Sequence, residues 1–169
     1  MSSIVDHQIR HLCKMSGLVE PFDPEMVNPA SIDVTLGPTL LVEGKPGEER
    51  WKEVDIRSWG AYSLAPGEFA LAHTQEFIRV PSNMEAVFNL KSSRGREGYE
   101  HLLAGYIDPG FHGRVTLELV NVNRYHRLPL EHGMRIGQLR FAKLDEIPMR
   151  SYAVTGRYFN DKGVQVSKG

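Results

Sequence analysis

The sequence predicts a mainly β fold with one short N-terminal helix. Its apolar residues fall in many short runs separated by Gly, Pro or Asn, which is typical of a β-barrel or a β-sandwich. Only the first 17 residues show apolar residues at helical spacing. The length of 169 residues, with 41% hydrophobic and 24% charged residues, suits one globular domain, so we expect residues 1–169 to form a single unit.

The helix is predicted near the N-terminus. Ser3 is a favourable N-cap, and Asp6 follows three residues later. Ile9 and Leu12 continue the apolar spacing, and Gly17 suits the C-terminal end. The segment lacks the apolar stretch of a signal peptide, and no apolar run in the chain approaches the roughly 20 residues that span a bilayer.

Nine strands are predicted after the helix, because short runs suited to strands lie between turn signals. The predicted ranges are 31–36, 39–42, 69–74, 77–80, 86–90, 102–106, 114–121, 127–130 and 136–143. A polar, Gly-containing tail follows at residues 151–169. It is either a frayed end or a flap over an active site.

The strand at 114–121 carries a carboxylate in its middle. Alternation places Val115, Leu117 and Leu119 on one face, which we expect to be the core, and Glu118 on the other face. A carboxylate is costly to bury without partners. Glu118 therefore lies either on an exposed strand face or in a functional cleft.

Composition excludes several classes of function. The net charge of −1 gives no overall reason to bind nucleic acid, so an anion site must be a local cluster. The single cysteine, Cys13, favours a cytoplasmic location and excludes the two-cysteine signature of zinc deaminases. The pair His7 and His11 lacks the Glu of a zincin helix. We therefore expect no zinc, no nucleic acid and no membrane as partners.

A basic turn at residues 91–96 is a candidate phosphate site. Lys91 and Arg96 can pair with phosphate oxygens, and the hydroxyls of Ser92 and Ser93 can donate hydrogen bonds to them. The alternative is a solvated basic turn without a ligand.

Two further segments are ambiguous on spacing alone. Asp108 begins the sequence Asp-Pro-Gly, which is a plain turn signal as well as a place for a ligand-binding carboxylate. Residues 133–141 form a turn and an alternating strand, so Gln138 belongs either to a core strand or to a base or phosphate contact.

Together and in this order, the motifs resemble those of the dCTP deaminases of the dUTPase-like superfamily. The matching segments are residues 29–37 (PASIDVTLG), 91–93 (KSS) with Arg96, 104–110, 116–121 (TLELVN) and 133–141. The resemblance runs from the helix to about residue 141. It implies a distorted β-barrel subunit, a homotrimer with sites at subunit interfaces, and a deoxycytidine triphosphate substrate that carries Mg²⁺ on its phosphates.

The resemblance implies catalytic roles for four residues. Glu118 aligns with the glutamate that takes a proton from the water attacking C4 of cytosine. Ala104 aligns with the residue whose carbonyl helps to orient that water. Ser92 and Arg96 align with residues at the phosphates and the reacting centre.

The resemblance also implies substrate contacts. Lys91 stands where an arginine is usual, and with Ser93 we expect it at the phosphates. Asp108 aligns with the carboxylate that binds the sugar 3′-hydroxyl, and in dUTPases the same position is the base for water attack on the α-phosphate. Gln138 is a further substrate-binding candidate.

The tail matches the family only loosely. Arg157 and Tyr158 are its expected phosphate contacts, and Tyr152 and Asp161 are further substrate-binding candidates. Asp161 falls near a glutamine that reads the base in the family. A modified cytosine or a monophosphate therefore remains an alternative substrate.

The leading hypothesis is a zinc-independent hydrolase that converts dCTP to dUTP and ammonia. Glu118 favours this reaction over that of a plain dUTPase, because plain dUTPases typically lack this glutamate. One alternative is a bifunctional enzyme that continues to dUMP and pyrophosphate. Gly105 beside Ala104 makes this segment resemble the bifunctional or dUTPase forms of the family. The other is a nucleotide-binding regulator without activity.

Overall fold

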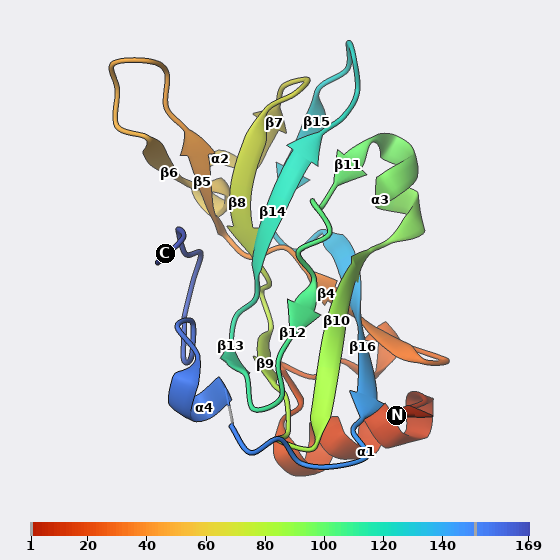
Figure 1. The fold of residues 1–169 in the computed structure, drawn as a ribbon. Coiled ribbons are helices and arrows are strands. Elements are labelled where there is room, and N and C mark those ends of the chain that lie inside the picture. Colours follow the sequence, from red (N-terminus) through yellow and green to blue (C-terminus); the bar gives the residue numbers. More distant parts are fainter. Residues whose placement is uncertain (1, 151) are drawn as a thin grey trace.

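A computed structural model describes residues 2–150 and 152–169 (Figure 1). Strands make up 40% of the structure and helices 16%, so the predicted mainly β fold with a short N-terminal helix is confirmed. The strands of the described residues form four sheets, which enclose one apolar core.

The largest sheet has six strands, with β12, β10, β16, β4 and β3 in this order and β1 beside β16. These strands are β1 (Ser2–Ser3), β3 (Val27–Asn28), β4 (Ser31–Thr35), β10 (Met84–Leu90), β12 (Tyr106–Ile107) and β16 (Arg135–Lys143). β10 and β16 pair over their length, with Phe88 opposite Leu139. Both side chains are almost completely buried, so this pair forms the centre of the core.

The second sheet has five strands, in the order β11, β14, β8, β5 and β6. These strands are β5 (Thr39–Glu43), β6 (Trp51–Asp55), β8 (Phe69–His73), β11 (Tyr99–Glu100) and β14 (Thr116–Asn121). β14 carries Glu118 directly opposite Leu71 of β8. The face of this sheet that points away from the core positions the candidate site.

Two small sheets and short helices complete the fold. The small sheets are β13 (His112–Gly113), β9 (Phe77–Arg79) and β2 (Val19–Glu20), and β15 (Leu128–Glu131) with β7 (Ala61–Leu64). The helices are α1 (Asp6–Ser16), η1 (Pro24–Met26), α2 (Ile56–Trp59), α3 (Ser92–Glu97) and α4 (Tyr152–Thr155). None of the helices in the described part of the chain is long and apolar enough to cross a membrane.

The N-terminal helix begins later than predicted. Its N-cap is Val5, whose amide donates to Oε1 of Gln8 at 3.1 Å. Ser3 cannot cap the helix because it pairs with Ala142 in β1. Gly17 ends the helix in the left-handed region (φ 63°), as predicted, because glycine adopts this conformation without steric cost.

The predicted strand at 102–106 is wrong. Leu102 and Leu103 adopt positive φ angles of 39° and 58°, which no strand residue adopts, and strand β12 begins only at Tyr106. The basic turn at 91–96 is in fact largely the short helix α3, and β6 was not predicted at all. The other eight predicted strands are confirmed with ends shifted by one or two residues.

Candidate active site

A pocket of about 1010 Å³ opens between the outer face of β14 and the C-terminal tail, which we define as residues 152–169. Seven of the predicted site residues line it: Ala104, Asp108, Glu118, Tyr152, Arg157, Tyr158 and Asp161. In Figure 1 the tail runs along one side of the molecule, from α4 toward β6. The structure thus brings all three predicted carboxylates, Asp108, Glu118 and Asp161, into one pocket, while their chemical roles stay predictions.

The other five predicted site residues do not line this pocket within the described parts of the chain. They are Lys91, Ser92, Ser93, Arg96 and Gln138. Figure 1 shows α3, which contains three of them, on the side of the molecule away from the tail. The side chains of Ser92, Ser93 and Arg96 are exposed, and Gln138 Oε1 accepts a hydrogen bond from Ser31 Oγ at 3.1 Å.

Lys91 points toward a buried carboxylate. Its Nζ lies 2.6 Å from Asp33 Oδ2, and the Asp33 side chain is only 2% exposed. Arg135 Nη1 lies 3.5 Å from the same oxygen, and Asn28 Nδ2 donates to Asp33 Oδ1 at 2.8 Å. Because a buried charge needs partners, these contacts explain how Asp33 is tolerated in strand β4. They also fix the chain where α3 begins.

Glu118 occupies the outer face of β14, as its place in the strand predicts. Leu117 and Leu119 on the opposite face are fully buried in the core. The Glu118 side chain is 28% exposed, and its Oε2 is buried without a hydrogen-bond partner among the described residues. Burial raises the pKa of Glu118 above its ordinary value, because the charged form loses hydration.

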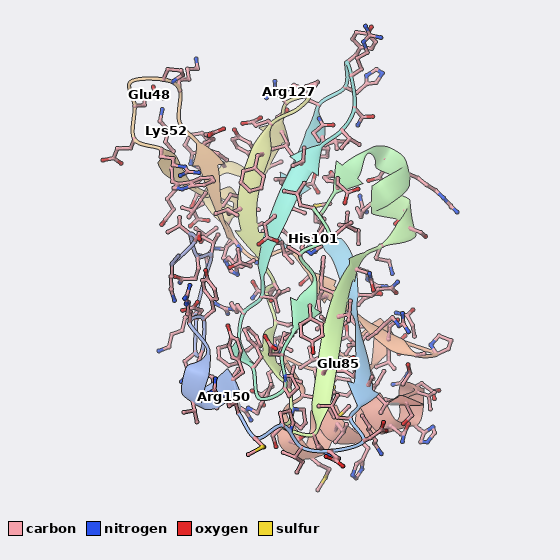
Figure 2. The ribbon with its side chains drawn as sticks, viewed as in Figure 1. Glu48, Lys52, Glu85, His101, Arg127 and Arg150 are labelled. Atoms are coloured by element: carbon pink, nitrogen blue, oxygen red, sulfur yellow. The ribbon has the colours of Figure 1, made fainter. Side chains whose placement is uncertain are left out.

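His101 is the site residue that the sequence analysis missed. Its Nδ1 lies 3.7 Å from Glu118 Oε2, and neither ring nitrogen has a hydrogen-bond partner among the described residues. Figure 2 shows His101 between β14 and β10. The ring of Phe88 in β10 packs edge-on against the imidazole, with ring centres 4.6 Å apart. Burial lowers the pKa of His101 and so favours the neutral imidazole. Buried polar atoms usually have hydrogen-bond partners, so the ring nitrogens of His101 and Oε2 of Glu118 are candidates for hydrogen bonds to a substrate.

A left-handed turn carries the chain from His101 to the pocket wall. Leu102 and Leu103 have positive φ angles, and their side chains are 52% and 96% exposed. Gly105 then passes so close to β10 that a Cβ would lie 2.2 Å from the carbonyl oxygen of Phe88. Only glycine fits there, so Ala104 is held at the pocket wall while His101 points inward.

Asp108 lies in a turn and in the pocket wall at once. Its carbonyl accepts a hydrogen bond from the Phe111 amide at 3.1 Å, which confirms the turn that its sequence predicts. The next residue, Pro109, accepts from the Tyr152 amide at 3.2 Å. This contact anchors the start of the tail beside Asp108.

The tail docks on its own chain by backbone hydrogen bonds. The Asn160 amide donates to the His112 carbonyl at 2.6 Å, and the Arg114 amide donates to the Asp161 carbonyl at 2.9 Å. Further along, the Gln165 amide donates to Thr116 Oγ1 at 3.2 Å. The tail therefore follows β13 and β14 and covers part of the pocket; of the predicted flap, residue 151 lies outside the described residues.

Lys168 closes the tail on itself. Its Nζ lies 3.0 and 3.1 Å from the two carboxylate oxygens of Asp161, and it donates to the Arg157 carbonyl at 2.9 Å. The same ammonium lies 4.9 Å from the centre of the Tyr158 ring. Asp161 is therefore paired within the tail, which leaves the guanidinium of Arg157 as a positive group for the pocket.

We expect Gly113→Val to release the tail. A Cβ at Gly113 would lie 3.1 and 3.2 Å from the carbonyl oxygen and the amide nitrogen of Asp161, so a branched side chain must push the tail away. Trypsin should then cut after Arg157 or Lys162 at least several-fold faster than in the wild type. Gly163→Val is the matched control, because a Cβ there meets no described atom within 4 Å. Equal cleavage rates for the two variants would show that the tail does not dock through Gly113.

Comparison with known proteins identifies the family. A family model described as dCTP deaminase-like matches residues 3–144. The chain belongs to the dCTP deaminase-like family. The resemblance stated from its motifs is thereby confirmed, and so is the expectation of an enzyme.

Relatives match over nearly the whole chain. The chain is 38% identical over 171 residues to "dCTP deaminase, dUMP-forming" of Aquifex aeolicus (strain VF5), with 96% of this chain and 92% of that protein covered. It is 40% identical over 166 residues to the protein of the same name from Beutenbergia cavernae, with coverage of 89% and 85%. The family model itself ends before the tail, at residue 144.

A solved structure supports the fold. The chain is similar to the crystal structure of 2′-deoxycytidine 5′-triphosphate deaminase from Agrobacterium tumefaciens, with a TM-score of 0.69 and 26% identity. The match covers 83% of this chain and 48% of that one, so the chain spans about half the length of the Agrobacterium protein. The predicted dUTPase-like fold class is confirmed.

Proposed function

We propose that this enzyme deaminates dCTP with water and then hydrolyses the product to dUMP and pyrophosphate. The observation that carries the proposal is Glu118, a partly buried carboxylate that faces His101 in a pocket that Asp108 also lines; its Oε2 has no hydrogen-bond partner among the described residues. The dUMP product, which was the alternative at the level of sequence, is supported by the names of the relatives.

In the first reaction, Glu118 acts as the general base. It takes a proton from water while the water oxygen bonds to C4 of cytosine, and it then passes protons to N3 and to the amino group. The C4–N bond breaks, so dCTP and water give dUTP and ammonia. A carboxyl group with a raised pKa suits this work, because it is a stronger base and holds its proton longer.

His101 and Ala104 would position the reacting groups. A neutral imidazole 3.7 Å from Glu118 can share a hydrogen bond with the carboxylate or the water without a competing positive charge. The carbonyl of Ala104, fixed by the left-handed turn, would accept the second hydrogen bond of the water.

In the second reaction, Asp108 would activate a water that attacks the α-phosphate. The P–O bond to the β-phosphate breaks, so dUTP and water give dUMP and pyrophosphate. Arg157 and Tyr158 would contact the phosphates from the tail, and both line the pocket beside Asp108. Asp108 would also hold the sugar 3′-hydroxyl during the first reaction.

A second copy of the chain would complete the site, in a homotrimer. The proposal is supported by the exposed side chains of Ser92, Ser93 and Arg96, which do not line the pocket of their own chain within the described residues. In an assembly they would reach the pocket of a neighbouring copy. They would there contact the phosphates of its nucleotide, because a guanidinium and hydroxyl groups donate strong hydrogen bonds to phosphate oxygens.

Mg²⁺ would enter with the nucleotide. No group of three or more His, Cys, Asp or Glu side chains among residues 2–150 and 152–169 is arranged to hold a metal ion. Mg²⁺ readily keeps several waters and binds phosphate oxygens, so a nucleotide-borne ion suits this pocket.

The raised pKa of Glu118 predicts the pH dependence of deamination. The base form is lost as the pH falls through this pKa, so kcat/KM for ammonia release should fall on the acid side with a midpoint above 4.5, the ordinary value for Glu. Ammonia release at dCTP concentrations well below KM, measured from about pH 4 to 8, checks this. A midpoint at or below the ordinary value would contradict a buried general base.

The proposal is tested with a panel of substrates and Mg²⁺. Ammonia, pyrophosphate and the product base are measured together from dCTP, dUTP, dCMP and CTP. Ammonia from dCTP and pyrophosphate from both deoxynucleoside triphosphates are expected. Ammonia without pyrophosphate would reduce the function to formation of dUTP, and tight binding of dCTP without either product would indicate a regulator.

A further inference from the structure

The pocket continues past Glu118 along an apolar wall. On the outer face of the second sheet, Leu71 lies opposite Glu118 and Phe69 lies opposite Val120. The ring of Trp51 in β6 packs against Phe69, with ring centres 5.9 Å apart. Trp51, Phe69 and Leu71 all line the pocket.

The two ends of the pocket differ in chemistry. One end, near α4, holds Asp108, Arg157 and Tyr158. The other end, near β6, holds Trp51 and Phe69, with Val166 of the tail lining the same pocket. Arg50 also lines this end, with its guanidinium carbon 5.5 Å from the centre of the Trp51 ring. Figure 1 shows α4 near one end of the tail and β6 near the other. Glu118 therefore lies beside an apolar wall that has a cation at its far edge.

The shape of the cytosine ring determines what meets the apolar wall. N1 carries the sugar, and C4 lies across the ring from N1. If the sugar lies at Asp108 and C4 at Glu118, as the proposed function requires, both neighbours of C4, N3 and C5, lie at the end of the ring away from Asp108. Glu118 must also reach N3 to protonate it, so C5 lies on the other side of C4, which we place toward the apolar wall. A group attached to C5 would then lie against Leu71, Phe69 and Trp51.

We infer that this wall is a subsite for an apolar substituent at C5, so that the substrate class includes 5-methyl-deoxycytidine triphosphate. The inference rests on the proposed function, because it uses Glu118 to place C4. Burying one methyl group contributes about fourfold to kcat/KM, which is ~0.8 kcal/mol. The kcat/KM for 5-methyl-dCTP should therefore equal or exceed the kcat/KM for dCTP. Unmodified dCTP would leave the wall partly in contact with water.

The experiment measures the ratio of kcat/KM for ammonia release from 5-methyl-dCTP to kcat/KM for ammonia release from dCTP. Leu71→Phe fills the subsite and should lower the ratio at least about tenfold, the lower bound for one methylene in an apolar pocket. Because Leu71 is only 7% exposed and a larger side chain can disturb packing, Trp51→Ala is the second variant. It removes one side of the wall and should lower the ratio about two- to fourfold.

Trp59→Ala is the matched control, since this tryptophan is 76% exposed and does not line the pocket among the described residues. It should leave the ratio unchanged. A wild-type ratio below one, or a ratio that neither Leu71→Phe nor Trp51→Ala changes, would overturn the subsite. No ammonia from either substrate would instead contradict the proposed function, so the two failures are distinguishable.

Discussion

Glu118→Gln should lower ammonia release from dCTP by about 10²- to 10⁴-fold, the contribution typical of a general base. The amide keeps the size of the side chain but cannot accept the proton of the attacking water. The fold should tolerate the change, because Glu118 Oε2 is buried without a hydrogen-bond partner in the described part of the chain, so no such bond is lost. Ammonia release at saturating dCTP and the thermal unfolding midpoint measure the two effects.

Glu131→Gln serves as the control for Glu118. Glu131 lies on β15, is exposed and is absent from the residues that line the pocket in the described chain. The control should keep wild-type activity. If Glu118→Gln released ammonia at a rate near that of Glu131→Gln, Glu118 would not be the general base.

Asp108→Asn should lower pyrophosphate release from dUTP by a similar factor of about 10²- to 10⁴-fold. The amide can still donate a hydrogen bond to the sugar but cannot take a proton from the water that attacks the α-phosphate. Deamination of dCTP should continue with a raised KM, because it depends on Glu118 for chemistry. The variant should therefore release ammonia and accumulate dUTP.

The control for this second prediction is Asp6→Asn. Asp6 lies in the first turn of α1, and the described residues that line the pocket do not include it. Loss of ammonia and pyrophosphate together in Asp108→Asn would mean that Asp108 serves only to hold the nucleotide. Unchanged pyrophosphate release would exclude Asp108 as the base of the second reaction.

Local sequence patterns predicted most of the fold because strands and turns depend on neighbouring residues. The alternation around Glu118 placed its side chain outside the core, and the structure confirms this with Leu117 and Leu119 buried behind it. The strand at 102–106 was wrong because Leu102 and Leu103 adopt left-handed backbone conformations that leucine rarely adopts. No apolar pattern reveals such a turn.

The rest of the site depends on contacts between distant parts of the chain. His101 is three residues before Ala104, which was its one signal in the sequence. Its approach to Glu118 depends on the packing of two sheets, because its ring also contacts Phe88 of β10. Lys91 was predicted at phosphates, and its ion pair with Asp33 spans 58 residues of sequence. Neither contact can be read from spacing.

The tail shows the same limit. Its polar composition fits a frayed end as well as a flap, and only the long-range backbone bonds of Asn160, Asp161 and Gln165 place it beside β13 and β14. The pairing of Asp161 with Lys168 also depends on the turn of the tail. Docking of the tail thus requires the whole fold.

The most direct test of the account follows the oxygen of water through both reactions. Wild-type enzyme, Mg²⁺ and dCTP are incubated in ¹⁸O-labelled water, and the products are analysed by mass spectrometry together with ammonia. The account predicts one label on the C4 oxygen of the uracil ring, a second label on the phosphate of dUMP and none on pyrophosphate, and one ammonia per dUMP. Conversion of dCTP without label at C4, or no release of ammonia, would contradict it.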